Sequence, residues 1–456
     1  MIILFAAFLR FRDLPKMAGF DFDQESASFI VDEIIKYNHT RLIGQELTFR
    51  GIFMGPYYYY LLTPFYVLSN MHPIGGLIAS VISSIAIIAA YYYVGNALFH
   101  YPAGLLAALF RSVLFEELIH DWSMVPSYFC ELIVLLTWFC LWKIIHHKKQ
   151  KYLYLLTFLF GLYPSFYPIL FPFYFIFLFL LTFHILKVKK EVLIKSLVFL
   201  TLPMTPTIVF EVKNNFLQTR RLIELFMEPS TSSVKLISKF TKHLTYNTSE
   251  LSRIINFDFL PRGLFIVMVV ITLSYLIRNK VNFWQIGLHK KLLILTYAIF
   301  ILSFTFLPMP VSENYFLALS TISLLYISAT SSILYRYPIG RVILVFLVAN
   351  IVFYNLSRLK SYSENPTLAN LYHKEQIVKE IVRRSNNQEF YVSYIYLPGW
   401  QHGFRYLFYY YETIPKSGPA SPPVYTIVVP KYLSHDAIDI SYGNVGLILP
   451  DSKTGL

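Results

Sequence analysis

Apolar runs recur along the whole chain, and short polar segments separate them. A helix needs about 20 mostly apolar residues to cross a bilayer. The pattern therefore predicts a bundle of membrane-spanning helices with loops on both sides. The expected spans lie near residues 1–10, 76–95, 103–117, 127–143, 152–164, 168–186, 194–210, 263–277, 291–307, 316–334 and 341–356.

The first of these runs, residues 1–10, has only half the length that a crossing requires. A cleaved signal peptide is one explanation. However, Met-Ile-Ile contains no basic residue, and no small-residue cleavage site follows. We therefore expect a truncated or mis-started first span.

The aromatic run at residues 57–68 is also apolar, with four consecutive tyrosines. Counting it as a crossing would reverse the orientation of every later loop. Because tyrosine rings favour the membrane–water interface, we expect an amphipathic helix that lies on the outer surface.

The pattern changes after residue 356. Residues 371–384 have the spacing of a charged helix, 390–397 and 424–430 are rich in β-formers, and Pro, Gly and Ser punctuate 415–423. We expect a membrane domain over residues 1–356 and a small extracytoplasmic α/β domain over 357–456.

Composition supports the membrane class: the chain is 56% hydrophobic and 14% charged, against about 25% charged in soluble domains. The net charge of +13 does not indicate nucleic acid, because the basic residues gather in alternate loops. The loops 143–151, 187–195, 278–291 and 336–341 hold 14 Lys and Arg and one acid, Glu191. The positive-inside rule assigns them to the cytoplasm. The outer loops are then 11–75, 116–126, 211–262 and 308–315.

Three carboxylates, Asp21, Asp23 and Glu25, follow the first apolar run directly. Charge this close to a bilayer is costly, so these acids are functional candidates. Asp21-Phe-Asp23 also fits the Asp-x-Asp metal motif of nucleotide-sugar transferases, but nucleotide sugars lie in the cytoplasm. Asp21 can equally cap a helix over residues 24–37.

Four segments resemble a known family in the same order. They are Phe22-Asp-Gln-Glu-Ser-Ala-Ser-Phe-Ile-Val-Asp-Glu-Ile-Ile35, Leu42-Ile-Gly44 with Gly51-Ile-Phe-Met-Gly-Pro-Tyr-Tyr-Tyr-Tyr-Leu-Leu62, Asp121-Trp-Ser-Met-Val-Pro126, and Leu202-Pro with Phe210-Glu-Val-Lys-Asn-Asn-Phe-Leu-Gln-Thr219. The chain thereby resembles the GT-C membrane glycosyltransferases of the protein mannosyltransferase and aminoarabinose transferase type. Family members usually carry Asn at the position of Ser123 and often Pro at that of Gln45.

The resemblance implies an all-α polytopic GT-C fold and a transferase at the outer face of the cell membrane. Such enzymes move a sugar from a polyprenyl-phosphate carrier to an acceptor hydroxyl on a protein, lipid or polysaccharide, without a cofactor or metal. It places the general base at Asp23, with Asp21 and Glu25 beside it. Asp121 in the second outer loop matches an acid that faces the first across the site.

A carrier phosphate needs cations at the membrane surface. The candidates are Arg50, Lys213, Arg220 and Arg221, each of which could also be a snorkelling charge. The candidate substrate groove comprises Tyr57, Tyr58, Trp122 and Glu211, although an aromatic belt explains the tyrosines as well.

A transporter or flippase of a lipid-linked saccharide is the rival class. Such a protein would be expected to show inverted repeats, broken helices and charges within its spans. This chain instead concentrates its acids in the outer loops, which favours an enzyme.

Overall fold

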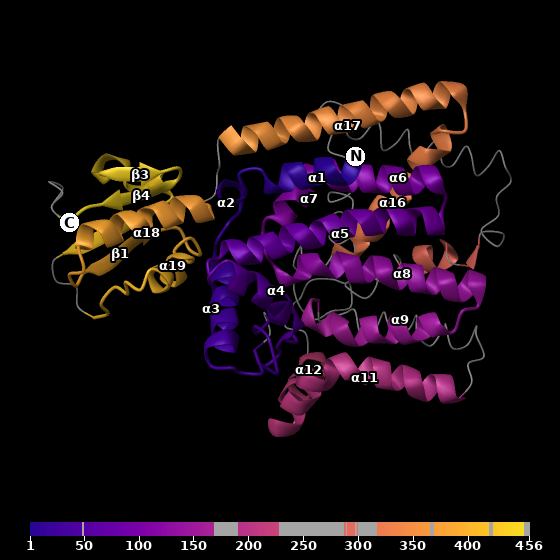
Figure 1. Ribbon diagram of the computed structural model, residues 1–456, viewed down its shortest axis with the longest axis horizontal. Helices are drawn as coiled ribbons and strands as arrows, with labels where there is room; N and C mark the ends of the chain where they lie inside the picture. Colours follow the sequence, from indigo (N-terminus) through magenta and orange to yellow (C-terminus); the bar gives the residue numbers. More distant parts are fainter. Residues whose placement is uncertain are drawn as a thin grey trace.

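The computed structural model describes residues 1–47, 50–167, 190–227, 287–288, 290–296, 299, 317–364, 369–418 and 423–450. These residues form a layered array of long helices with a small α/β unit at one end (Figure 1). The expected spans 168–186 and 263–277, and most of 291–307, lie outside the described residues.

Within the described residues, five apolar helical segments are long enough to cross a membrane. They are α5 (Ile74–Leu98), the 3-10 turn η1 (Pro126–Phe129) with α8 (Cys130–His147), α11 (Lys190–Lys213), α16 (Leu317–Leu334) and α17 (Pro338–Glu364). The 25 residues of α5 reach about 38 Å at 1.5 Å per residue. The expected all-α polytopic membrane class is confirmed.

Shorter helices occupy three further expected spans: α1 (Ile2–Phe11), α6 (Tyr101–Val113) and α9 (Lys151–Leu162). The expected span 103–117 is interrupted, because Leu114 adopts an extended backbone and α7 (Phe115–Asp121) begins after it. Asn355 Oδ1 accepts the free Phe115 N–H at 2.8 Å, which satisfies a donor at this helix start.

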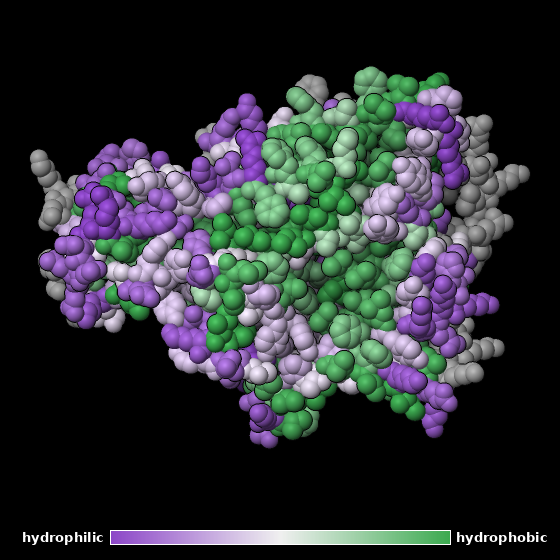
Figure 2. Space-filling view, viewed as in Figure 1, coloured by the Kyte–Doolittle hydropathy of each residue, from purple (hydrophilic) through white to green (hydrophobic). Residues whose placement is uncertain are grey.

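The two ends of the helix array differ in character. The connections from α8 to α9 and from α16 to α17 lie at one end, and the C-terminal unit lies at the other (Figure 1). Figure 2 shows apolar surface over the helices and polar side chains at both ends. The basic connections are therefore separated from the C-terminal unit by the apolar layer, as alternate loops require.

Three short helices stand at the same end as the C-terminal unit. They are α3 (Phe22–Lys36), α4 (Tyr57–Leu68) and α12 (Leu217–Met227). Helix α4 occupies the expected aromatic run. Its Tyr58, Tyr59 and Tyr66 are fully buried, while Leu68 is 82% exposed. One face of α4 therefore packs into the protein, and its place on the outer membrane surface stays a prediction.

The C-terminal unit is a helix packed on a four-stranded sheet, which confirms the expected α/β fold. Strands β1 and β2 are parallel, and β2–β4 and β4–β3 are antiparallel, in the order β1-β2-β4-β3. Buried Leu371, Ile377, Val378 and Ile381 form the apolar side of α18. The elements are α18 (Leu371–Ser385), β1 (Tyr391–Tyr396), α19 (Phe404–Tyr410), β2 (Val424–Val429), η5 (Lys431–Ala437), β3 (Ile440–Tyr442) and β4 (Val445–Ile448). Helix α17 ends at Glu364, eight residues after the expected domain boundary.

Candidate active site

The three acids of the first outer loop lie on different sides of the start of α3. Asp21 is the N-cap residue, as expected, and its N–H donates to Gln24 Oε1 at 2.9 Å. Residues advance by about 100° around a helix. Asp21 and Glu25 therefore share one face, and Asp23 points to the opposite one.

The C-terminal unit binds both Asp21 and Glu25. The buried Lys374 ammonium lies 2.7 Å from Asp21 Oδ1. The Tyr406 N–H donates to Glu25 Oε1 at 3.0 Å, and His402 Nδ1 lies 3.9 Å from Glu25 Oε2. These two carboxylates are thus held in fixed contacts on the side of α18 and α19.

Asp23 has different surroundings. Among the described residues, Asp23 accepts one long hydrogen bond, from Gln45 Nε2 to its Oδ1 at 3.5 Å, and no cation lies within 4.0 Å of it. Burial raises the pKa of Asp23, the Gln45 amide lowers it in part, and the negative charge of Asp21 raises it again. A partly desolvated carboxylate without a counter-ion is suited to accept a proton.

Gln45 is held in place by a hairpin-like segment. Gly44 N–H donates to Met54 O at 2.6 Å, and Met54 N–H donates to Gln45 O at 3.0 Å. The hydroxyl oxygen of Tyr59 accepts the Gln45 N–H at 3.1 Å and contacts Gln45 Oε1 at 3.3 Å. A Cβ at Gly44 would lie 2.7 Å from the Tyr59 ring, so this close approach requires glycine. Gln45, one of the two residues that depart from the pattern of the resembled family, is thus held where it contacts the candidate base.

A cleft with a volume of about 500 Å³ lies beside this hairpin. Two cations line it: Lys213 at the end of α11, and Arg41, whose Nη1 lies 2.5 Å from Glu33 Oε2. Lys213 is exposed and has no ion-pair partner among the described residues. The other residues lining the cleft are His39, Thr40, Leu42, Ile43 and Phe210.

The cleft is connected to Asp23 through Gln45, the hydrogen-bond partner of Asp23. Arg41 is four residues from Gln45, so their Cα atoms are at most about 14 Å apart. Tyr60 of α4 donates to Arg41 O at 2.7 Å, while Tyr59 beside it contacts Gln45. Sequence reasoning missed Arg41, although it directly precedes the family-like segment Leu42-Ile-Gly44.

Among the four expected phosphate ligands, only Lys213 lines the cleft. Arg50 and Arg220 are exposed. Arg221 pairs with Glu224 at 2.7 Å and packs beside Gly51 at the hairpin tip. Their role in binding phosphate stays a prediction that this arrangement does not favour.

The four residues expected to form the substrate groove lie in different environments. Tyr57 keeps part of its surface exposed. Tyr58 is buried and donates to Met124 O at 2.6 Å, and the buried Trp122 donates to Arg10 O at 3.0 Å. Glu211 accepts the N–H groups of residues 218 and 219 and so caps α12. Tyr57 is therefore the member of this set best placed to meet a substrate.

Asp121, expected to face Asp23, lies in a buried ion-pair network, and its role in the reaction stays a prediction. Arg10 Nε is 2.7 Å from Asp121 Oδ2, and Arg111 Nη2 is 2.7 Å from Asp121 Oδ1. Because two guanidinium groups neutralise this carboxylate, its geometry favours a structural role. The two outer loops do meet, through the Gln24 amide, which donates to Ser123 O, and through Tyr58, which donates to Met124 O.

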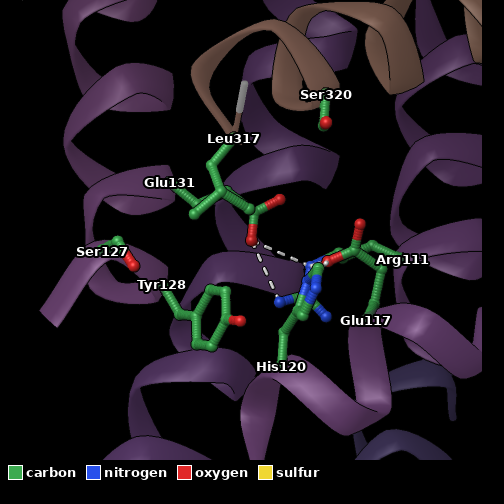
Figure 3. A pocket seen from close by; sticks show the side chains of 8 residues that line it. All are labelled: Arg111, Glu117, His120, Ser127, Tyr128, Glu131, Leu317 and Ser320. Carbon is green, nitrogen blue, oxygen red and sulfur yellow. Dashed lines mark hydrogen bonds and ion pairs between the residues drawn. The ribbon is translucent and has the colours of Figure 1, made fainter. Parts of the chain in front are cut away.

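The same network extends into the helix array. Figure 3 shows Glu117, His120 and Glu131 around Arg111 at a cavity with a volume of about 10 Å³. Arg111 Nη2 lies 3.0 Å from Glu131 Oε2, and its Nε lies 3.3 Å from Glu117 Oε2. His120 stacks on Tyr128 with 4.4 Å between ring centroids. A cavity of this size holds one water molecule and no sugar.

Comparison with known proteins gives a fold but no sequence relative. No protein-family profile matches the chain, and no curated protein matches it. A crystal structure of ArnT from Cupriavidus metallidurans bound to undecaprenyl phosphate matches with a TM-score of 0.60 and 9% identity, over 98% of this chain and 97% of that one. The apo structure of the same protein gives a TM-score of 0.59.

A second neighbour is the oligosaccharyltransferase of Archaeoglobus fulgidus in complex with zinc and sulfate. It matches with a TM-score of 0.53 and 10% identity, over 94% of this chain and 67% of that one. Both neighbours are GT-C proteins. At such low identity the likeness concerns the fold alone. The chain has the GT-C fold that its sequence motifs predict.

Proposed function

We propose that this protein is a glycosyltransferase that moves a sugar from a polyprenyl-phosphate carrier to an acceptor hydroxyl. The observation that carries the proposal is Asp23, a half-buried carboxylate without a counter-ion in the described residues. Its partner Gln45 lies four residues from Arg41, which lines a cation-lined cleft. A GT-C neighbour bound to undecaprenyl phosphate supports the choice of carrier.

The reaction follows from these groups. Asp23 accepts the proton of the acceptor hydroxyl as its oxygen attacks the anomeric carbon of the sugar. The bond between that carbon and the phosphate oxygen breaks, and the polyprenyl phosphate leaves with the bonding electrons. A phosphate is a fair leaving group, so the main task of the protein is to activate the acceptor.

Charge that develops on the leaving phosphate needs cations nearby. In our proposal Lys213 and Arg41, which both line the cleft, supply this positive charge. Lys213, which has no ion-pair partner in the described part of the chain, can turn towards a ligand, and Arg41 can exchange its contact with Glu33 for a phosphate oxygen. Tyr57 and Tyr60 offer apolar surface for the first isoprene units.

The alternative, a metal held by Asp21 and Asp23, receives less support. The Lys374 ammonium forms an ion pair with Asp21 at 2.7 Å, so the two acids do not present a pair of free carboxylates. Within the described part of the chain, no group of three His, Cys, Asp or Glu side chains is placed to share a metal ion.

We further propose that the acids and the C-terminal unit face the outer side of the cell membrane. The support is the position of the basic connections at the far end of the helices (Figure 1).

Binding of undecaprenyl phosphate to the full-length, detergent-solubilised protein tests the carrier assignment, with native mass spectrometry as the readout. Replacing both Arg41 and Lys213 by Ala is expected to weaken binding roughly 100-fold or more, since each charged hydrogen bond is worth about 1.5–3 kcal/mol. Arg383→Ala, which removes an exposed cation of α18 paired with Glu380, is the matched control. Equal binding by the double variant and the wild type would contradict the assignment.

A further inference from the structure

The start of α18 is hydrogen-bonded to the segment that leads into α3. Three alternate carbonyl groups, those of Lys16, Ala18 and Phe20, each accept a hydrogen bond from it. Asn370 Nδ2 donates to Lys16 O at 2.6 Å and Leu371 N–H donates to Ala18 O at 3.0 Å. The third donor is Lys374 Nζ, 2.7 Å from Phe20 O.

Lys374 is the most constrained group of this contact. Its side chain is 0% exposed. Besides Phe20 O, the ammonium donates to Asp21 Oδ1 and to His402 O, each at 2.7 Å. All three protons of the ammonium group are thus used. Asp21 is its ion-pair partner, and the charge of Glu25 also faces it.

Two of these acceptors fix the point where α3 begins. The Phe20 carbonyl and the Asp21 carboxylate belong to the two residues that directly precede the first helical residue, Phe22, and Asp23 stands in the first turn. A rotation of this turn would move Asp23 away from Gln45 and the cleft. Reaction geometry tolerates little displacement, since about 1 Å can reduce a rate about 100-fold.

We propose that Lys374 is a positioning residue: through Phe20 O and Asp21 it sets the first turn of α3, and so the place and charge environment of Asp23. The C-terminal unit thereby becomes part of the active site. This inference rests on the proposed function only in naming Asp23 as the base.

Replacing Lys374 or Asp21 should shift the pKa of Asp23 in opposite directions. Asp23 faces Asp21 on its own helix and Tyr58 and Tyr59 from α4. Lys374 compensates the charge of Asp21. Without Lys374, the negative charge of Asp21 acts on Asp23 in full and raises its pKa. Without Asp21, Asp23 loses this repulsion and its pKa falls.

Other contacts keep the C-terminal unit in place when Lys374 is replaced. Tyr409 donates to Asp32 Oδ2 at 2.7 Å, and Tyr406 donates to Met71 O at 2.9 Å. His72 Nε2 lies 3.3 Å from Glu375 Oε1. We therefore expect Lys374→Met to change the start of α3 without detaching the unit.

The test is the titration of the Asp23 carboxyl group in the full-length protein, followed by pH-difference infrared spectroscopy and assigned with Asp23→Asn. In Lys374→Met the midpoint should rise by about half a pH unit or more, and amide hydrogen exchange of residues 22–25 should quicken. Adding Asp21→Asn should bring the midpoint back down. Arg383→Met, which removes an exposed cation of α18 paired with Glu380, should change neither property.

The midpoint of Asp23 in a second variant also tests the role of Lys374. Asp21→Asn alone keeps a good helix cap and should lower the midpoint, so the idea stays testable if Lys374→Met fails to fold. Unchanged midpoints in both variants would overturn it, even if the wild type transfers sugar. Shifted midpoints in a protein that transfers no sugar would support the role of Lys374 and contradict the proposed function instead.

Discussion

Replacing Asp23 by Asn separates a catalytic role from a structural one. Asn has nearly the same size, and its side-chain oxygen can still accept the Gln45 amide, which lies 3.5 Å from the carboxylate. It cannot accept the acceptor's proton at neutral pH. Loss of a general base reduces a rate by about 10²–10⁴-fold.

The same substitution should leave the stability of the folded protein unchanged or increase it, although it lowers the rate. Burial raises the pKa of Asp23 in the folded protein, so the charged carboxylate is disfavoured there. Its contribution to stability is therefore lost as pH rises from the unfolded pKa to the folded one, and it does not return at higher pH. A neutral Asn lacks this penalty. At neutral pH the variant should unfold at the same temperature as the wild type or higher.

The assay is mass spectrometry of cell-envelope glycans in cells that carry only the variant, normalised to its amount in the membrane. Asp13→Asn is the matched control, because Asp13 is an exposed acid of the same loop beside Arg12. We expect Asp23→Asn to form almost none of the glycan, and Asp13→Asn to form it normally. More than about a tenth of wild-type transfer by the Asp23 variant would refute the assignment.

Three further predictions follow from the same account. The acid limb of the pH–rate profile should lie above the ordinary Asp pKa of about 3.9, because Asp23 must be ionised; a limb at or below that value would speak against Asp23. Arg111→Met should lower the free energy of unfolding by about 3–5 kcal/mol, as it leaves buried carboxylates unpaired, and thermal unfolding measures this; an unchanged stability would contradict the structural role of the network. A cysteine at Lys148 should resist an impermeant reagent in intact cells while one at Ser393 reacts, and labelling at Lys148 would reverse the orientation.

Local patterns predicted several of the described helices and the N-cap at Asp21. Apolar runs mark α5, α8 and α17, and the Asp21 cap is a short-range signal three residues from its partner Gln24. Helix periodicity also explains why Asp23 alone turns away from the C-terminal unit. The resemblance to GT-C enzymes supplied the fold, which the structure confirms.

Ion pairs between residues far apart in the sequence could not be predicted from local patterns. Asp121 lies 111 residues from Arg10, and Asp21 lies 353 residues from Lys374. No spacing rule connects such residues, so sequence reasoning expected Asp121 to face Asp23 and did not single out Lys374. Arg41 was missed because its cleft forms only when α11 packs beside the first outer loop.

The amount of carrier-linked sugar tests the central claim most directly. Lipid extracts from cells with the wild-type protein, with Asp23→Asn, and without the protein can be compared by mass spectrometry. We predict that a polyprenyl-phosphate sugar accumulates to a similar extent in the last two, while one envelope glycan disappears. Equal carrier-linked sugar and unchanged glycans in all three would contradict the account.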